Sequence, residues 1–300
     1  MMIMSERDLI GYGANPPHPR WPNDSRIAVQ FVINYEEGGE RSVLYGDRES
    51  EAFLTEEPTR EFSNIRNLNV ESQYEYGSRS GFWRLHRLFT ERQLPVTVYG
   101  IAQALATHPE AVAAMREAQW EIASHGLRWI NYAEMPEQEE RRHIARAVKL
   151  HTEVTGEAPL GWYTGRMSVN SRRLIVEQGG FLYDSDSFAD DLPYWEIVQG
   201  HRHLVIPYTL DNNDGRYVNS YGFQAPNFSD YLIQAFDLLY QEGKQQPKMM
   251  SIGLHTRISG KPGRAADLAR FLDYVCARPG VWVTRRVDIA RHWHRHFSGD

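Results

Sequence analysis

The sequence contains a single cysteine, Cys276, among its 300 residues. One thiol cannot form an internal disulfide or a thiolate cage for a metal ion, so disulfide-stabilised secreted modules and zinc-finger folds are excluded. The opening segment MMIMSERDLIGYG also lacks an apolar run long enough for a signal peptide or a membrane span. We therefore expect a cytoplasmic protein with no membrane partner.

Clustered positive charge is missing as well. The chain has 33 Lys and Arg against 39 Asp and Glu, a net charge of −6, and its basic residues are spread along the sequence. A nucleic-acid partner requires a basic surface that binds phosphates, so we expect none. Apolar residues make up 41% of the chain, enough for a substantial core, and no repeat or flexible linker divides it. We expect one domain over residues 1–300.

Short β-rich segments alternate with amphipathic helical stretches. We expect eight strands, at Ile27–Tyr35, Leu94–Tyr99, Trp120–Ser124, Leu160–Thr164, Phe181–Asp184, Leu204–Leu210, Met249–Leu254 and Val281–Thr284. This alternation favours an α/β fold with a parallel sheet, and eight units in about 250 residues favour closure into a (β/α)8 barrel. An open doubly wound sheet is the alternative, although the G-x-G-x-x-G of its dinucleotide-binding version is absent after the first strand.

Two polar segments are too long to be simple barrel connections. Residues 38–80 are rich in acidic and aromatic side chains, and residues 211–228 are rich in Asn, Gly and Tyr. Both follow strands, so they fall at the end of the barrel where active sites lie. Surface decoration would explain them. Long loops in compact domains are usually functional, however, so we expect these two to cap the pocket or form an oligomer interface.

Twelve histidines invite a metalloenzyme interpretation, and their positions filter them. In a barrel, ligand-facing residues follow the carboxyl ends of strands. Most of the histidines lie on helical stretches or in the amino-terminal arm, and His201 and His203 precede the sixth strand, where we expect a solvated turn. By contrast, His125 in ASHG and His255 in GLHTR follow the third and seventh strands. We expect these two histidines to face a ligand.

The first predicted strand supplies carboxylates. Alternation places Gln30, Val32, Asn34 and Glu36 on one face, so we expect Asn34 and Glu36 to point into the mouth of the barrel. Glu37 would point elsewhere unless the strand bulges, and we rank Glu36 above it as the active carboxylate. The start of an ordinary polar loop would also explain the two glutamates.

Other predicted strands end in polar residues that could support the histidines. These residues are Tyr163, Thr164, Arg166, Asp184, Asp186, Asp211 and Arg257. A catalytic histidine usually needs a carboxylate or a carbonyl to fix its tautomer. The sequence leaves open which Asp serves which His.

The motifs NYEEG, ASHG, GWYTGR, GGFLYDSDSF and GLHTR, in this order, resemble those of the polysaccharide deacetylase superfamily. The resemblance covers most of the chain. It implies a distorted (β/α) barrel of the TIM type with extra segments at its top. Members are commonly metal-dependent amide hydrolases, in which an Asp and two His hold a divalent cation, a second Asp acts as base and a late His acts as acid.

The metal-binding positions of that superfamily are altered in this sequence. Its two histidines are four residues apart; the first corresponds to His125, and the second position holds Trp129. Its first-strand Asp corresponds to Glu36, or to Glu37 if the alignment shifts by one, and Asn34 falls near the base position. An indole cannot coordinate Zn²⁺, so two protein ligands remain where three are expected. We expect no cofactor, with a divalent metal as the alternative.

Glu, His and Trp in place of Asp, His and His, together with NYEEGGE and the insertion after it, resemble one branch of the superfamily, the metal-independent allantoinases of purine degradation. The resemblance implies hydrolysis of the cyclic amide bond of allantoin to allantoate. It also implies a homotetramer, with a small-molecule pocket narrowed by the two insertions.

Hydrolysis of a ring amide without a metal requires an activated water, a stabilised oxyanion and a protonated leaving nitrogen. We expect Glu36, His125 and His255 to be catalytic, with proton transfer at Glu36 and His255, while the group that activates water stays open. The substrate-binding residues that we expect are Trp129, Asn34, Tyr163, Arg166, Arg257 and Glu37. The alternatives are a metal-dependent deacetylase or another cyclic imide hydrolase, and a non-catalytic binding barrel.

Overall fold

The computed structural model describes residues 7–56, 61–218 and 228–298. Its strands are β1 Ile27–Tyr35, β2 Thr97–Gly100, β3 Glu121–Ser124, β4 Gly161–Trp162, β5 Tyr183–Asp184, β6 Tyr194–Val198, β7 His201–Val205, β8 Lys248–His255 and β9 Val281–Val283. They form one sheet in the order β6-β7-β5-β4-β3-β2-β1-β8, with β9 paired to the first residues of β1. The β6–β7 pair is antiparallel, and the other strand pairs are parallel.

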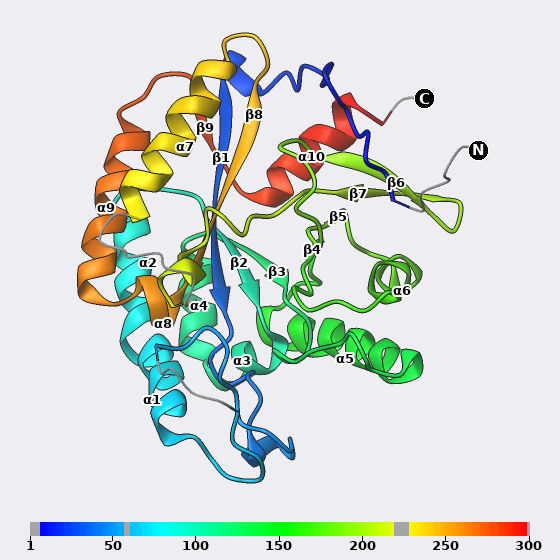
Figure 1. The fold of residues 1–300 in the computed structure, drawn as a ribbon, viewed down its shortest axis with the longest axis vertical. Coiled ribbons are helices and arrows are strands. Elements are labelled where there is room, and N and C mark those ends of the chain that lie inside the picture. Colours follow the sequence, from blue (N-terminus) through cyan, green and yellow to red (C-terminus); the bar gives the residue numbers. More distant parts are fainter. Residues whose placement is uncertain (1–6, 57–60, 219–227, 299–300) are drawn as a thin grey trace.

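Helices follow most strands and cover the outside of the curled sheet (Figure 1). They are α1 Leu68–Tyr76, α2 Phe82–Thr90, α3 Ala102–Thr107, α4 Pro109–Glu117, α5 Glu137–Thr155, α6 Ser171–Gln178, α7 Phe228–Glu242, α8 Thr256–Ser259, α9 Pro262–Cys276 and α10 Arg286–His296, with short helical turns η1 Pro22–Asp24, η2 Val43–Tyr45, η3 Gly77–Gly81 and η4 Asp214–Tyr217. The longest, α5, begins after Pro136 with three glutamates in its first turn, where the helix dipole favours negative charge.

The barrel is completed irregularly between β7 and β8. Among the described residues, an isolated parallel bridge joins Asn213, after β7, to Gly253 of β8. Glycine leaves room for this contact, because a Cβ on Gly253 would lie 2.2 Å from the Asn213 side-chain amide, which would have to shift. The fold is therefore a distorted (β/α) barrel of the polysaccharide deacetylase type, as the sequence predicts, and its closure depends on a loop rather than on a full strand pair.

Alternation along β1 separates the outer core from the interior of the barrel. Phe31 faces the helices and packs against Phe89 and Phe271, with ring centroids 5.3 and 6.2 Å away. Val32 faces inward, in a buried cluster that includes Tyr99 and Tyr208. Every residue of β1 is buried, because its two faces are covered by different layers.

The region around β6 and β7 differs from the sequence prediction. The segment Tyr194–Val198 was not expected to be a strand, and it pairs with His201–Val205, which begins three residues before the predicted sixth strand. The prediction of a solvated turn at His203 is wrong. Its side chain is buried, and its Nε2 lies 2.8 Å from Asp184 Oδ2, so the hairpin brings this histidine into the sheet.

The first insertion lies beyond the carboxyl end of β1, in the blue-to-cyan region of Figure 1. Its described part contains η2, α1 and the π-helical turn η3, and residues 57–60 lie outside the described residues. The second insertion is described only over 211–218 and at Phe228, and it places η4 against the end of β8, since Asp214 accepts the His255 backbone N–H at 2.7 Å. Both segments lie at the end of the barrel where ligand-facing residues are expected.

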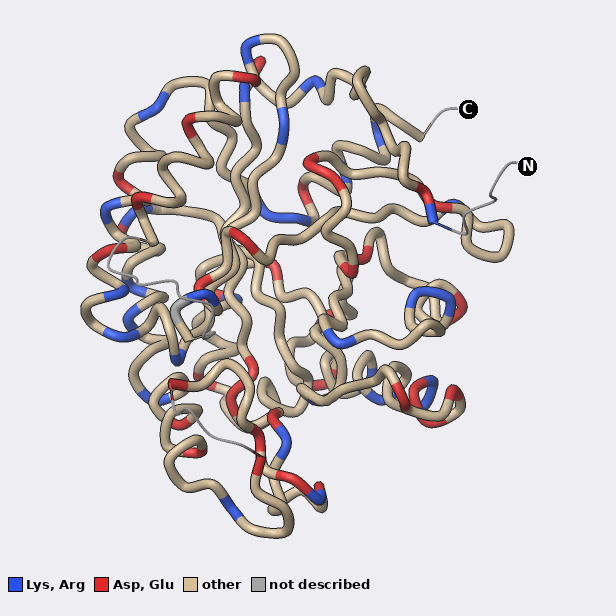
Figure 2. The backbone as a smooth tube through the Cα atoms, viewed as in Figure 1, with Lys and Arg blue, Asp and Glu red and all other residues tan. Residues whose placement is uncertain are grey.

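Basic and acidic positions are interspersed along the described backbone (Figure 2). No helix within residues 7–56, 61–218 and 228–298 is both long and apolar enough to cross a bilayer.

Candidate active site

A pocket of about 610 Å³ lies where the carboxyl ends of β1, β3 and β8 meet. Asn34 is on β1, Glu36 follows it directly, His125 follows β3, and His255 ends β8. The pocket is lined by Asn34, Glu36, Arg41, Phe53, Leu54, Glu61, His125, Trp129, Asn131, Tyr163, Gly165, Arg166, Tyr208, Leu210, Asn213, Gly215, Arg216 and His255. Parallel strands therefore bring together residues that are far apart in the sequence.

Glu36 is fully buried, and its two oxygens have different surroundings. Oε2 accepts a hydrogen bond from Arg257 Nη2 at 2.7 Å. Within the described part of the chain, Oε1 has no hydrogen-bond partner, and it lies 3.4 Å from His125 Nε2 and 3.6 Å from His255 Nε2. Burial acts to raise the pKa of Glu36, but the Arg257 guanidinium opposes it most strongly, and that pKa lies below its ordinary value. Glu36 is therefore a carboxylate at neutral pH, with one oxygen free.

His125 is oriented by a backbone carbonyl. Its Nδ1 lies 3.0 Å from the Tyr163 carbonyl oxygen, which can only accept, so Nδ1 carries a proton. In the neutral imidazole, Nε2 is then an acceptor that faces Glu36 Oε1, and Nε2 has no partner of its own. Two acceptors 3.4 Å apart need a common donor, such as a water or a ligand N–H, placed to one side of the pair because nothing fits between them.

His255 forms a dyad with Asp214, which the sequence analysis did not single out. His255 Nδ1 lies 2.6 Å from Asp214 Oδ1, and the other oxygen of this fully buried carboxylate accepts the backbone N–H groups of His255 at 2.7 Å and Ser259 at 3.2 Å. Asp214 therefore directs His255 Nε2 toward Glu36. The run DNNDG in the second insertion is the only local signal for it, and that signal does not distinguish Asp214 from Asp211.

Arg257 and Glu37 lie behind Glu36, outside the set of residues that line the pocket. Glu37 Oε2 accepts the backbone N–H of Glu36 at 3.1 Å, and Oε1 accepts from the Thr256 hydroxyl. Burial raises the pKa of Glu37. Arg257 is 2% exposed and also lies over the ring of Tyr74, 4.2 Å from its centroid. These two residues support Glu36 from the side away from the pocket.

Trp129 and Arg166 form one wall of the pocket. The Arg166 guanidinium lies 4.0 Å from the centre of the Trp129 ring, and the centroid of the His125 ring lies 5.0 Å from that ring. The first insertion holds Trp129 in place, because the backbone N–H of Trp129 donates to the Gly39 carbonyl at 2.7 Å. The indole Nε1 of Trp129 is buried and has no partner.

Asn34 and Tyr163 lie deeper in the pocket. Asn34 Nδ2 donates to the Tyr208 hydroxyl at 3.0 Å and to the Leu254 carbonyl at 3.2 Å. Tyr163 stacks on Tyr99 with ring centroids 4.8 Å apart. The amide of Asn34 is thus committed to protein groups.

Three predicted strand-end carboxylates lie away from the pocket. Asp184 pairs with Arg172 at 2.9 Å and with His203, and exposed Asp211 accepts from the Thr209 hydroxyl at 2.8 Å. Asp186 accepts the Thr164 and Gly165 backbone N–H groups, and burial together with neighbouring Asp184 raises its pKa to about 6. Their hydrogen bonds orient loops rather than either pocket histidine.

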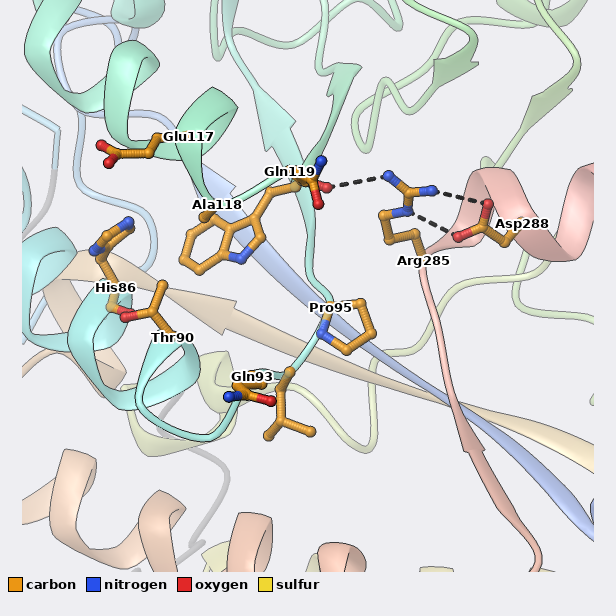
Figure 3. Close-up of a pocket in the computed structure, with 11 residues that line it drawn as sticks. His86, Thr90, Gln93, Pro95, Glu117, Ala118, Gln119, Arg285 and Asp288 are labelled. Atoms are coloured by element: carbon orange, nitrogen blue, oxygen red, sulfur yellow. Dashed lines mark hydrogen bonds and ion pairs between the residues drawn. The ribbon is translucent and has the colours of Figure 1, made fainter.

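A larger hollow of about 840 Å³ lies at the opposite end of the strands, around Pro95 and Gln119, which precede β2 and β3 (Figure 3). Two of its charged groups are already paired, since Arg285 bonds to Asp288 at 2.8 Å, and Arg285 also donates to the Gln119 carbonyl at 3.0 Å. The pocket around Glu36 instead collects buried polar atoms without partners, so we take it as the candidate active site.

Comparison with known proteins identifies the family. The polysaccharide deacetylase family model matches residues 69–180. A Schizosaccharomyces pombe protein, provisionally named a polysaccharide deacetylase, is 43% identical over an alignment that covers 96% of each chain. The chain belongs to the polysaccharide deacetylase family.

Two solved structures resemble this family member over nearly its whole length. The crystal structure of PuuE allantoinase is 54% identical with a TM-score of 0.97 and covers 99% of this chain and 100% of the other. A probable polysaccharide deacetylase from Pseudomonas aeruginosa PAO1 has the same identity and coverage with a TM-score of 0.96. The resemblance to the superfamily and its allantoinase branch is thus confirmed, and the chain is a hydrolase that acts on carbon–nitrogen bonds.

The site of this polysaccharide deacetylase family member does not fit a tightly bound divalent metal. Trp129 stands at the position of the second histidine, and an indole N–H can only donate. The Arg257 guanidinium, 2.7 Å from Glu36 Oε2, opposes a dication on the same carboxylate. Within the described ranges, no three His, Cys, Asp or Glu side chains are grouped so that they could hold a metal ion.

Proposed function

We propose that the protein is a metal-independent allantoinase, which opens the five-membered ring of allantoin by hydrolysing a cyclic amide bond to give allantoate. The observation that carries the proposal is the match to PuuE allantoinase over 99% of the chain, at 54% identity and a TM-score of 0.97. The chemistry of the pocket supports it independently.

Four buried polar atoms without partners surround the pocket. Two are acceptors, Glu36 Oε1 and His125 Nε2, and two belong to donors, Arg166 Nη2 and Trp129 Nε1. Unsatisfied buried groups are costly, so a ligand or water is expected to satisfy them. A small cyclic ureide matches this set, because its ring carries both N–H donors and carbonyl acceptors.

The acceptor pair is suited to position the attacking water. A water that donates one hydrogen to Glu36 Oε1 and the other to His125 Nε2, 3.4 Å apart, keeps a lone pair for the ring carbonyl carbon. Because Arg257 keeps Glu36 ionised, the carboxylate can take a proton from the water as the carbon–oxygen bond forms. Glu36 is therefore assigned as the base, with His125 holding the water.

His255 is suited to protonate the leaving nitrogen. With Nδ1 bonded to Asp214, the ring is held with Nε2 facing the pocket, where a proton on Nε2 can be donated. As the ring carbon–nitrogen bond breaks, the proton on Nε2 passes to the nitrogen, and the water oxygen stays on the carbon as part of the new carboxylate. Glu36 then releases the proton that it took from the water and His255 regains one, so both side chains return to their starting states and the reaction consumes one water.

The test is allantoin hydrolysis before and after exhaustive chelation, with metal content measured on the same preparation. The proposal predicts unchanged turnover in metal-free protein. A metal-dependent deacetylase, the activity in the name of the Schizosaccharomyces pombe relative, predicts stoichiometric Zn²⁺ that is lost together with activity. A non-catalytic barrel predicts no turnover with or without metal.

We also propose that the protein works as a homotetramer in the cytoplasm, on the resemblance to the allantoinase branch and the single cysteine, Cys276. Light scattering at several concentrations tests the assembly, and a monomer at every concentration would contradict it.

A further inference from the structure

Arg166 presents a guanidinium that is only partly satisfied. The residue follows β4 and lines the pocket, and its guanidinium lies 4.0 Å from the ring centre of Trp129 and 4.9 Å from that of Phe53. Nη1 is 3.3 Å from Glu51 Oε2. Nη2 is buried and bonds to nothing among the described residues. One edge of Arg166 is thus fixed by the protein, and the other lacks an acceptor.

Glu51 is the residue that fixes Arg166. Its side chain is fully buried, and the backbone N–H groups of Ala52 and Phe53 donate to Oε1, each at 2.9 Å. Arg41 lies on the same oxygen at 3.4 Å, so Oε2 is left for Arg166. A buried carboxylate that accepts two short hydrogen bonds from the backbone has little freedom to move. Its arginine partner is therefore held in a fixed position as well.

An unsatisfied guanidinium N–H in this pocket is suited to an oxygen that gains negative charge. In ring-amide hydrolysis, the carbonyl oxygen gains charge in the transition state and becomes a carboxylate oxygen in the product. Glu36 Oε1 and His125 Nε2 are acceptors and cannot bind it, whereas Arg166 Nη2 can.

We propose that Glu51 of the first insertion is a positioning residue, which holds Arg166 so that its free Nη2 binds the reacting carbonyl oxygen and then the product carboxylate. This inference rests on the proposed function. It assigns a specific role to the first insertion, because Glu51 and Phe53 both come from it while Arg166 comes from the barrel.

The test is a double-mutant cycle with Glu51→Gln and Arg166→Met, assayed for allantoin hydrolysis and for inhibition by allantoate. Glu51→Gln should lower kcat/KM about 10- to 100-fold, the range for a small misplacement of a catalytic group, and weaken allantoate inhibition by a similar factor. In the Arg166→Met background, Glu51→Gln should change kcat/KM less than about twofold, because its effect acts through Arg166. The control Glu49→Gln removes a half-exposed partner of Arg41, 3.4 Å away, and should have little effect.

Additive losses in the cycle, or a Glu51→Gln enzyme with wild-type kcat/KM and allantoate inhibition, would overturn the inference. If Glu51→Gln does not fold by circular dichroism, Glu51→Asp, which keeps the charge but withdraws it by one methylene, takes its place in the same cycle. Failure of the proposed function looks different, since the wild-type enzyme would then not hydrolyse allantoin.

Discussion

Replacing Asp214 by Asn removes one charge from a fully buried position and leaves the size of the side chain unchanged. The carboxylate accepts three N–H donors, which are His255 Nδ1 and the backbone N–H groups of His255 and Ser259. An amide has only one oxygen. If that oxygen faces the His255 ring, the amide NH₂ points at the backbone N–H groups of His255 and Ser259. These two donors then lack an acceptor, which costs about 1–3 kcal/mol each. The oxygen should therefore face the backbone and the NH₂ should face His255.

That orientation changes the tautomer of the imidazole. With an NH₂ at Nδ1, His255 must accept there and carry its proton on Nε2, and protonation to the imidazolium would place two donors against each other. A neutral imidazole is a very weak acid, so protonation of the leaving nitrogen should fail. The same replacement in a Ser-His-Asp triad lowers kcat about 10⁴-fold, and we expect a loss of at least 10³-fold for Asp214→Asn. KM should change little, since the proton moves only in the transition state.

The measurement is steady-state allantoin hydrolysis, alongside thermal unfolding to show that the fold is intact. Asp211→Asn is the matched control, because exposed Asp211 lies three residues away, bonds to the Thr209 hydroxyl and does not touch His255. It should keep kcat within about twofold, as surface changes usually do. A folded Asp214→Asn enzyme with more than a tenth of the wild-type kcat would refute the assignment of His255 as the proton donor held by Asp214.

Three further changes test other parts of the structure. Glu36→Gln keeps an oxygen for Arg257 but places NH₂ at the water site, so kcat for allantoin should fall about 10²- to 10⁴-fold, and wild-type turnover would exclude Glu36 as the base. Burial raises the pKa of Glu40 to about 7, so between pH 4.5 and 7 the folded state binds a proton that the unfolded state has lost. The free energy of unfolding of the wild type therefore falls as pH rises through about 4.5 to 7. Denaturant titrations should show that Glu40→Gln is more stable than the wild type by up to about 3 kcal/mol at pH 8 and equally stable at pH 4. Arg286→Met leaves several buried acceptors inside the barrel without a donor, so the free energy of unfolding should fall by about 3–5 kcal/mol in the same titration. The replacement of exposed Arg295 by Met should lower it by less than about 0.5 kcal/mol.

The predictable part of this fold is the part that local sequence determines. Each of the eight expected strand segments overlaps an observed strand, because buried parallel strands appear as short apolar runs between helical stretches. Period-two alternation also placed Asn34 and Glu36 on the inner face of β1. The β6–β7 hairpin was missed because Tyr194–Val198 is half exposed at the end of the sheet and has no run of buried residues to mark it.

Contacts across long sequence separations were not predictable. The bond from Asp214 to His255 spans 41 residues, and the bond from Glu51 to Arg166 spans 115. Neither contact has a periodic or motif signal, since Asp214 and Glu51 lie in the two insertions, whose paths depend on the folded barrel. The loops therefore had to be placed in three dimensions before their carboxylates could be paired with a histidine or an arginine.

The pairing of Glu36 with Arg257 supports the proposal that this pocket works without a metal ion. A metal bound at the mouth of a barrel would hold the acidic residue and keep it ionised, but it would occupy the oxygen that faces the pocket. Arg257 also holds Glu36 and keeps it ionised, but it does so through Oε2, from the side away from the pocket. It lowers the pKa of Glu36 without placing a group in the pocket itself. Oε1 is then free to accept from water, and the position of the missing ligand is filled by Trp129, whose ring carries Arg166. In the proposed mechanism, two arginines thus supply fixed positive charge, Arg257 to the base and Arg166 to the oxygen that gains charge.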